Sequence, residues 1–180
     1  DQDMDTVIAY GQLIRSVDPT IPFYVTVPWD DGKEITIRGV EKLVESGLID
    51  IWQPYWYNAW AGHGVWELLK QTGKPIWIYE ILANGPRNPN CGMSFYRLGH
   101  WYAFNYQVQG LGIYAAYSFD GDPWNDLDGK DDYYIHYNYG QNGFLSTRAF
   151  EAFRQGVQDH KLFVALKQVG VAESWINEQI

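Results

Sequence analysis

The chain has little cysteine and few long apolar runs, and both shortages limit what it can be. Cys91 is the single cysteine among the 180 residues, which excludes an internal disulfide and a zinc site built from several cysteines. No apolar run approaches the roughly 20 residues that a membrane-spanning helix needs. No Gly-rich phosphate loop follows any predicted strand, which argues against a nucleotide-binding doubly wound fold.

Positive charge is also scarce, with 13 Lys and Arg against 22 Asp and Glu and a formal net charge of −9 at pH 7. Nucleic acid and anionic membranes would repel such a chain, so we expect neither as a partner. The four histidines show no metal-ligand spacing. The aspartates of residues 126–132 depart from the helix–loop–helix calcium pattern, because Trp124 and Ile135 occupy its first and last ligand positions. We therefore expect no metal and no cofactor.

Aromatic residues, by contrast, are abundant. They make up 17% of the chain and include 9 Trp and 14 Tyr, which is more than a core of this size requires. Flat rings stack on the C–H face of a sugar, and carboxylates accept protons from its hydroxyl groups. Aromatic residues beside acids therefore predict a carbohydrate ligand.

Hydrophobic periodicity and turn residues predict helices that alternate with strands. Helices are expected over residues 3–16, 37–46, 65–72, 95–109 and 146–169, and strands over residues 23–27, 49–53, 75–81 and 111–119. An irregular connection is expected over residues 82–92. This order predicts an α/β fold with a parallel sheet and helical crossovers.

Four β/α units correspond to half of a TIM-type (β/α)8 barrel, which typically needs about 250 residues. We expect residues 1–170 to form the C-terminal half of such a barrel, and residues 171–180 to form a tail. A half barrel leaves two parallel edges unpaired, so we expect an N-terminal half or a second chain to complete it. The first residue is Asp1 and not Met, which is typical of a mature, cleaved or incomplete chain.

The candidate site residues lie at the C-terminal ends of the predicted strands, where barrel enzymes place their active sites. Glu80 follows three bulky residues at such an end. It could act as a nucleophile, a general base or a binding group, or it could be a rim residue paired with Arg87 or Arg97. Asp120 and Asp122 come just past the last strand, where they could bind hydroxyls, orient a substrate amide or hold a cation. Seven further residues are candidates for contact with a sugar or for packing: Trp29, Asp30, Gln53, Tyr55, Trp56, Tyr79 and Trp124.

The second half of the chain contains a series of segments in a recognisable order. They are Pro86-Arg87-Asn88-Pro89-Asn90, Tyr96-Arg97 with His100-Trp101, Gln109-Gly110-Leu111-Gly112-Ile113-Tyr114, Gly121-Asp122-Pro123-Trp124, and Ser146-Thr147-Arg148-Ala149-Phe150-Glu151 continuing to Asp159. Together they resemble the C-terminal part of the catalytic barrel of glycoside hydrolase family 123 and its DUF4091 relatives. The resemblance covers residues 75–168, and the first 74 residues agree only in element order.

The resemblance implies a retaining β-N-acetylgalactosaminidase that works by substrate assistance, outside the usual two-carboxylate scheme. In that family the substrate's acetamido oxygen attacks the anomeric carbon, an aspartate orients the amide, and the adjacent glutamate protonates the leaving oxygen. This chain contains no Asp-Glu dipeptide, and element order places the catalytic pair before Asp1. No catalytic residue is therefore assigned, although Glu80 and Asp120 are candidate contributors. The family also implies a secreted, cell-surface or periplasmic protein.

Two other interpretations stay open at this point. The chain could be a carbohydrate-binding or structural domain without catalysis, which would bind sugar through Trp29, Trp56 or Trp124. Alternatively, Glu80 could form a self-contained acid pair with Asp120 or Asp122, with a carboxylate separation that would indicate the mechanism. A precise catalytic site needs a rigid support, and a half barrel exposes too much unpaired strand edge to hold two carboxylates in a precise geometry. The acid pair is thus the weakest of the three interpretations.

Overall fold

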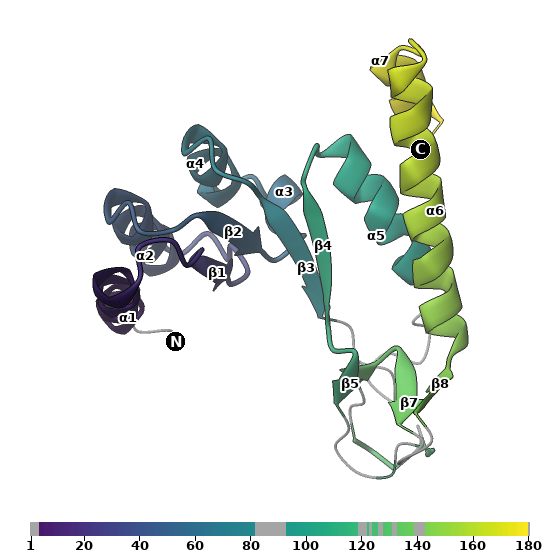
Figure 1. The fold of residues 1–180 in the computed structure, drawn as a ribbon, viewed down its shortest axis with the longest axis horizontal. Helices are drawn as coiled ribbons and strands as arrows, with labels where there is room; N and C mark the ends of the chain where they lie inside the picture. The colour runs from purple at the N-terminus through teal and green to yellow at the C-terminus, as the bar shows by residue number, and fades with distance from the viewer. Residues whose placement is uncertain are drawn as a thin grey trace. The chain divides into compact units, whose positions relative to one another are not determined.

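The structure is a computed structural model, and it describes residues 4–81, 93–118, 122, 124, 125, 128–130, 133–138 and 143–179 (Figure 1). The chain divides into two compact units. The first unit comprises Asp1–Tyr79 and Val108–Gly110, and the second comprises Glu80–Gln107 and Leu111–Ile180. The boundary between them falls within two strands, β3 (Trp77–Ile81) and β4 (Gly110–Tyr114), which form a two-stranded sheet.

The first unit alternates short strands with helices. In chain order it contains α1 (Met4–Val17), β1 (Tyr24–Val27), α2 (Glu34–Glu45), β2 (Ile51–Pro54), α3 (Asn58–Ala61), α4 (Val65–Gln71) and the start of β3. Strands β1 and β2 pair in parallel, with Tyr24 opposite Ile51 and Val27 opposite Pro54. Isolated parallel bridges join Trp52 of β2 to Ile76, directly before β3, and Tyr55, directly after β2, to Tyr79 of β3.

The core of the first unit follows from the alternation of its strands and the stripes of its helices. Successive strand residues point to opposite faces, so Val25 and Val27 of β1 are buried while Tyr24 is exposed. The helices α2 and α4 add buried residues spaced three or four apart, which is the helical period. These are Val40 and Leu43 of α2, and Val65 and Leu69 of α4.

An ion pair fixes the end of α1 to the start of β2. The Asp50 carboxylate accepts a hydrogen bond of 2.8 Å from the backbone N–H of Phe23 and pairs with the Arg15 guanidinium. The hydrogen bond from the Phe23 N–H is the main cause that lowers the pKa of Asp50 below its ordinary value, and the contact with Arg15 adds to this effect. Arg15 also donates to the carbonyl oxygens of Pro19 and Ile21, so the chain reversal after α1 is held by one side chain.

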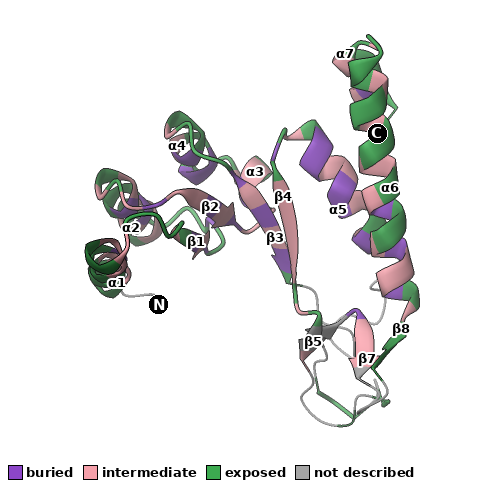
Figure 2. Ribbon diagram, viewed as in Figure 1, coloured by how far each residue is buried: buried purple, intermediate pink, exposed green. Residues whose placement is uncertain are grey.

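The second unit combines helices with short antiparallel strands. It contains α5 (Met93–Asn105), β5 (Tyr117–Ser118), β6 (Tyr133–Tyr134), β7 (His136–Asn138), β8 (Phe144–Ser146), α6 (Arg148–Gln168) and α7 (Glu173–Glu178). Strand β5 pairs with β6, and β7 pairs with β8, both antiparallel. In Figure 2 many of the buried residues of this unit lie on α5 and on the first half of α6, and Ile176 of α7 is buried as well.

The helices α5 and α6 pack closely against each other. A Cβ atom added at Gly156 of α6 would lie 2.4 Å from the His100 ring and 2.7 Å from the Arg97 carbonyl oxygen, so only glycine allows this approach. Beside it, Arg97 donates to both carboxylate oxygens of Asp159 at 2.5 and 3.0 Å. The indole N–H of Trp101 donates to the same carboxylate at 2.7 Å. This bidentate pair adds directional bonds to the apolar contact.

The prediction of a half barrel built from four parallel β/α units is wrong. Within the described residues the strands form four two-stranded sheets, β1–β2, β3–β4, β5–β6 and β7–β8, and only isolated bridges connect the β2 and β3 segments. The strand predicted over residues 111–119 ends at Tyr114, and two antiparallel pairs then precede α6 in place of a direct strand-to-helix connection. Sequence periodicity reports which residues are buried but not which strand lies beside which, and this is where the prediction failed. The expected tail contains helix α7.

Candidate functional site

Two consecutive residues after β1 contact two consecutive residues after β2. The Trp29 ring lies edge-on to the Tyr57 ring, with centroids 5.6 Å apart and planes at 86°. The backbone N–H of Asp30 donates to Oδ1 of Asn58 at 2.8 Å, and Nδ2 of Asn58 donates to the carbonyl oxygen of Pro28 at 2.9 Å. Asn58 is buried whereas both rings are exposed. Polar bonds thus hold the two loops together on the inside, and the rings remain on the surface.

The rings continue as a connected group that we call the aromatic cluster, defined as Trp29, Tyr57, Trp60 and Trp56. Tyr57 and Trp60 have centroids 5.4 Å apart at 77°, and Trp60 and Trp56 have centroids 5.1 Å apart at 72°. Such edge-to-face geometry is favoured by the ring quadrupole. The exposed fractions are 57% for Trp29, 39% for Tyr57 and 38% for Trp60. The cluster is therefore a packed group of rings with a large accessible surface.

Asp30 anchors the loops beneath the aromatic cluster. Its side chain is fully buried, with Oδ1 accepting from the Gly32 N–H at 3.2 Å and Oδ2 accepting from the Val65 N–H at 3.1 Å. The second bond reaches the first residue of α4, where helical N–H groups lack partners within the helix. The buried carboxylate therefore positions its neighbours and joins the loop after β1 to the start of α4.

His63 lies against the same carboxylate. Its Nδ1 is 3.1 Å from the Asp30 carbonyl oxygen and 3.5 Å from Asp30 Oδ1. The ring also packs over Gly32, whose φ of 72° lies in the left-handed region and where an added Cβ would meet the imidazole at 3.2 Å. A glycine at this position therefore serves both the turn and the ring contact.

The remaining candidates of the first unit lie beside this group or on the strand that precedes it. Trp56 belongs to the aromatic cluster, and its N–H donates to the Tyr79 carbonyl oxygen at 2.9 Å. Tyr55 and Tyr79 have ring centroids 5.7 Å apart and are both half-buried. Gln53 lies in β2 opposite Thr26 and is also half-buried. The structure therefore brings Trp29, Asp30 and Trp56 into one site.

The acidic candidates other than Asp30 belong to the second unit. Glu80 is buried in β3. Asp122 is exposed in a turn, where its Oδ1 accepts from the Trp124 N–H at 3.0 Å. The Trp124 ring stacks on Tyr137 at 4.2 Å with an interplanar angle of 15°, and it is exposed. Arg97, proposed above as an alternative partner of Glu80, is bound to Asp159. Asp120 and Arg87 lie outside the described residues.

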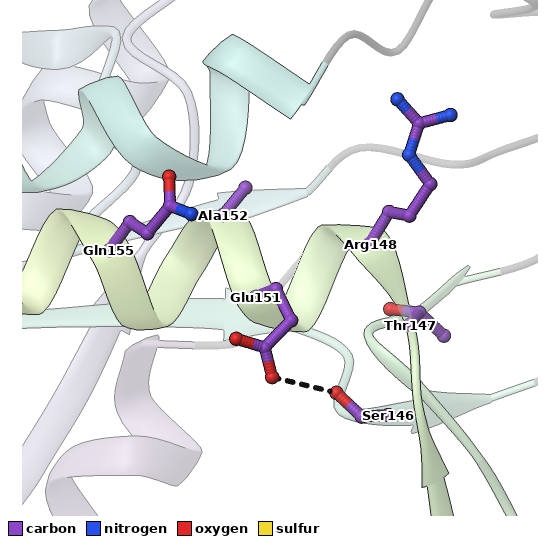
Figure 3. Close-up of a pocket in the computed structure, with 6 residues that line it drawn as sticks. All are labelled: Ser146, Thr147, Arg148, Glu151, Ala152 and Gln155. Atoms are coloured by element: carbon purple, nitrogen blue, oxygen red, sulfur yellow. Dashed lines mark hydrogen bonds between the residues drawn. The ribbon is translucent and has the colours of Figure 1, made fainter.

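A cavity of about 470 Å³ lies at the N-terminal end of α6 (Figure 3). It is lined by Ser146, Thr147, Arg148, Glu151, Ala152 and Gln155, and it includes none of the predicted site residues. Three of its polar groups already form hydrogen bonds: Thr147 accepts from the Phe150 N–H, and Glu151 accepts from Ser146 Oγ at 3.2 Å. The hydrogen bond from Arg154 is the main cause that lowers the pKa of Glu151 below its ordinary value, and the hydrogen bond from Ser146 adds to this effect. A carboxylate already occupies this helix end, so the cavity is a poor site for an anion.

Sequence reasoning missed four residues of the site: Tyr57, Asn58, Trp60 and His63. One signal was available, because Trp56 and Trp60 are four residues apart and residues at that spacing share a helical face. Helix α3 spans only Asn58–Ala61, too short to produce a periodic pattern of its own. Neither Asn58 nor His63 carries a local signature of the bonds that it makes.

Neither a metal site nor a membrane-spanning helix is found among the residues that the structure describes. Among the described residues, no group of three or more His, Cys, Asp and Glu side chains is placed to hold a metal ion. No helix in that part of the chain is both long enough and apolar enough to span a bilayer. Comparison with known proteins finds no matching family model and no matching curated protein.

Proposed function

We propose that the first unit binds carbohydrate at the aromatic cluster. The observation that carries the proposal is the exposure of Trp29, Tyr57 and Trp60 on a support made of buried polar bonds. Large apolar surface on a soluble domain is unfavourable in water and often marks a binding site. A sugar covers such rings with its C–H face and leaves its hydroxyls for polar neighbours.

The support beneath the rings favours binding because the loops are ordered before a ligand arrives. The Asp30 N–H bond to Asn58 and the Val65 N–H bond to Asp30 join the loop after β1 to α3 and to α4. Ordering a loop upon association costs free energy that a preorganised site does not have to supply. Rings held at 72–86° to one another also present faces in different directions.

The chemistry of the chain favours an uncharged sugar. A formal net charge of −9 repels sulfated and other polyanionic glycans at long range but has no such effect on neutral ones. The resemblance of residues 75–168 to family 123 glycoside hydrolases suggests an N-acetylated β-glycoside. Such a ligand also offers an acetamido methyl group, which adds apolar contact with the rings.

Titration of the protein with methyl N-acetyl-β-galactosaminide, followed by tryptophan fluorescence, tests this proposal. We expect a saturable change in emission for the wild type, with mannitol at the same concentrations as the control for viscosity and refractive index. A titration that stays flat up to the solubility limit of the sugar would overturn carbohydrate binding at the aromatic cluster.

A second candidate function is a role as part of a glycoside hydrolase that acts on N-acetylated β-glycosides. The ordered segments of residues 86–159 support it, and so does Glu80, a carboxylate buried near the end of β3. Because the chain has no Asp-Glu dipeptide, the catalytic pair of such an enzyme would belong to sequence outside residues 1–180. Residues 1–180 should then bind an aryl N-acetyl-β-galactosaminide without cleaving it. Turnover would instead locate the acid in this chain, with Glu80→Gln as the first variant to test.

A further inference from the structure

We propose that His63 binds the same ligand as the aromatic cluster, with its Nε2 accepting a hydrogen bond from a sugar hydroxyl. The inference rests on the proposed carbohydrate function and adds a polar contact that governs ligand orientation. The observation behind it is the contact between His63 Nδ1 and the backbone of Asp30, the residue that directly follows Trp29.

The Asp30 contact determines which ring nitrogen carries the proton. The carbonyl oxygen of Asp30 lies 3.1 Å from Nδ1, and a carbonyl oxygen has no proton to donate. Nδ1 must therefore be the donor. Asp30 Oδ1, 3.5 Å away, is a second acceptor on the same side and favours the same arrangement. In a neutral imidazole whose Nδ1 is protonated, Nε2 has a free lone pair and acts as an acceptor.

The position of the ring gives Nε2 access to a ligand. The two nitrogens point in divergent directions, so a ring that directs Nδ1 toward buried Asp30 directs Nε2 away from it. The His63 side chain remains 46% exposed. Contact with Gly32 and Asp30 restrains the ring, and a restrained acceptor loses less entropy upon binding than a mobile one.

A polar contact beside the rings would provide what aromatic stacking lacks. Stacking rewards any flat C–H face, whereas a single fixed acceptor selects ligands that present a hydroxyl at the matching position. Asp30 is fully buried and its oxygens accept backbone N–H groups, whereas the His63 side chain extends to the surface. Asp30 thus acts as the positioning residue, and His63 makes the contact.

Two substitutions separate the two nitrogens. In His63→Asn the amide can replace Nδ1 and keep the bond to Asp30, but nothing replaces Nε2. In His63→Gln the longer side chain can place its amide where Nε2 lies. We expect His63→Asn to weaken binding of methyl N-acetyl-β-galactosaminide about threefold to tenfold, as for the loss of one hydrogen bond. We expect His63→Gln to recover part of that loss. Urea unfolding of both variants should resemble that of the wild type.

Imidazole ¹⁵N spectra provide a readout that a purely structural role would not change. At a pH where the imidazole is neutral, we expect the free protein to show Nδ1 protonated and Nε2 unprotonated, and the sugar to shift the Nε2 signal more than the Nδ1 signal. If the wild type and His63→Asn bind equally well while Trp29→Ala binds about tenfold or more weakly, the role of His63 is overturned and the aromatic cluster stands. If the wild type itself does not bind, the proposed function fails. A spectrum with Nε2 protonated would contradict the tautomer independently of any ligand.

Discussion

The backbone N–H of Asp30 donates to Oδ1 of Asn58 at 2.8 Å, and this bond underlies the surface where Trp29 meets Tyr57. The two residues come from loops 28 positions apart in the chain. Each of them directly follows a residue whose ring is exposed, Trp29 before Asp30 and Tyr57 before Asn58. A polar bond in the interior and an aromatic contact at the surface therefore result from the same local pairing.

Trp29→Ala should weaken sugar binding about tenfold or more, because truncation of an exposed aromatic anchor commonly costs at least that much. Trp29 is 57% exposed, so little of the fold depends on its ring. Trp175→Ala is the matched control, since Trp175 is 51% exposed and lies in α7 of the second unit. Calorimetric titration of both variants checks the prediction, and equal loss of affinity in the two would contradict it.

Asp30→Ala should destabilise the first unit by about 2–4 kcal/mol, because the Gly32 and Val65 N–H groups both lose a buried acceptor. The measurement is the free energy of unfolding in urea. Glu41→Ala, at an exposed position of α2, serves as the control and should leave the midpoint nearly unchanged. A midpoint for Asp30→Ala equal to that of the control would show that the carboxylate does not support the loops.

Gly156→Ala should destabilise the second unit by about 1–3 kcal/mol through overpacking. The added Cβ would meet a backbone oxygen at 2.7 Å as well as the His100 ring, and the backbone of α5 cannot rotate away as a side chain can. Gln155→Ala, the exposed neighbour on the same helix, is the control. Thermal unfolding of both variants provides the comparison, and an unchanged or higher melting temperature for Gly156→Ala would contradict the close approach of α5 and α6.

The second unit should lose stability as the pH falls from about 6.5 to about 4. Burial is the main cause that lowers the pKa of His100 from 6.5 to about 4, and the charge of His160 lowers it further. The charge of Asp159 partly opposes this shift. The unfolded chain therefore binds more protons than the folded chain between pH 6.5 and about 4. The free energy of unfolding decreases as the pH is lowered through this window, and it levels off below about pH 4. The full effect is about 3 kcal/mol.

Urea unfolding at several pH values measures this dependence. The pKa of Asp159 is lowered by its hydrogen bond from Arg97, so this ion pair persists through the window and the His100 effect can be seen. His100→Leu should show a flatter dependence between pH 6.5 and 4 than the wild type, whatever its absolute stability. Parallel curves for the two proteins would exclude His100 as the source of the slope.

Most helices could be predicted from the sequence because their signals are local. The helix expected over residues 65–72 is α4 (Val65–Gln71), and the helix expected over residues 146–169 contains α6 (Arg148–Gln168). The assembly of strands could not be predicted in the same way. Pairing depends on contacts between distant residues, and a two-residue strand such as β5 (Tyr117–Ser118) is too short to alternate visibly.

The site shows the same division. Trp29, Asp30 and Trp56 were predicted from their positions after strands, and the structure brings them together. The burial of Asp30 could not be predicted, because it depends on N–H groups supplied by Gly32 and Val65 after the chain has folded. An aspartate beside a tryptophan looks the same in a sequence whether it faces a ligand or supports a loop.

The most direct test of carbohydrate binding at the aromatic cluster is a titration of the nine indole N–H signals in an NMR spectrum of the ¹⁵N-labelled protein with methyl N-acetyl-β-galactosaminide. Substitution of single tryptophans assigns the signals. We predict that the signals of Trp29 and Trp60 move in a saturable manner while that of Trp175 stays in place. If no signal moves, or if Trp175 moves and Trp29 does not, the assignment of a carbohydrate site to the aromatic cluster is wrong.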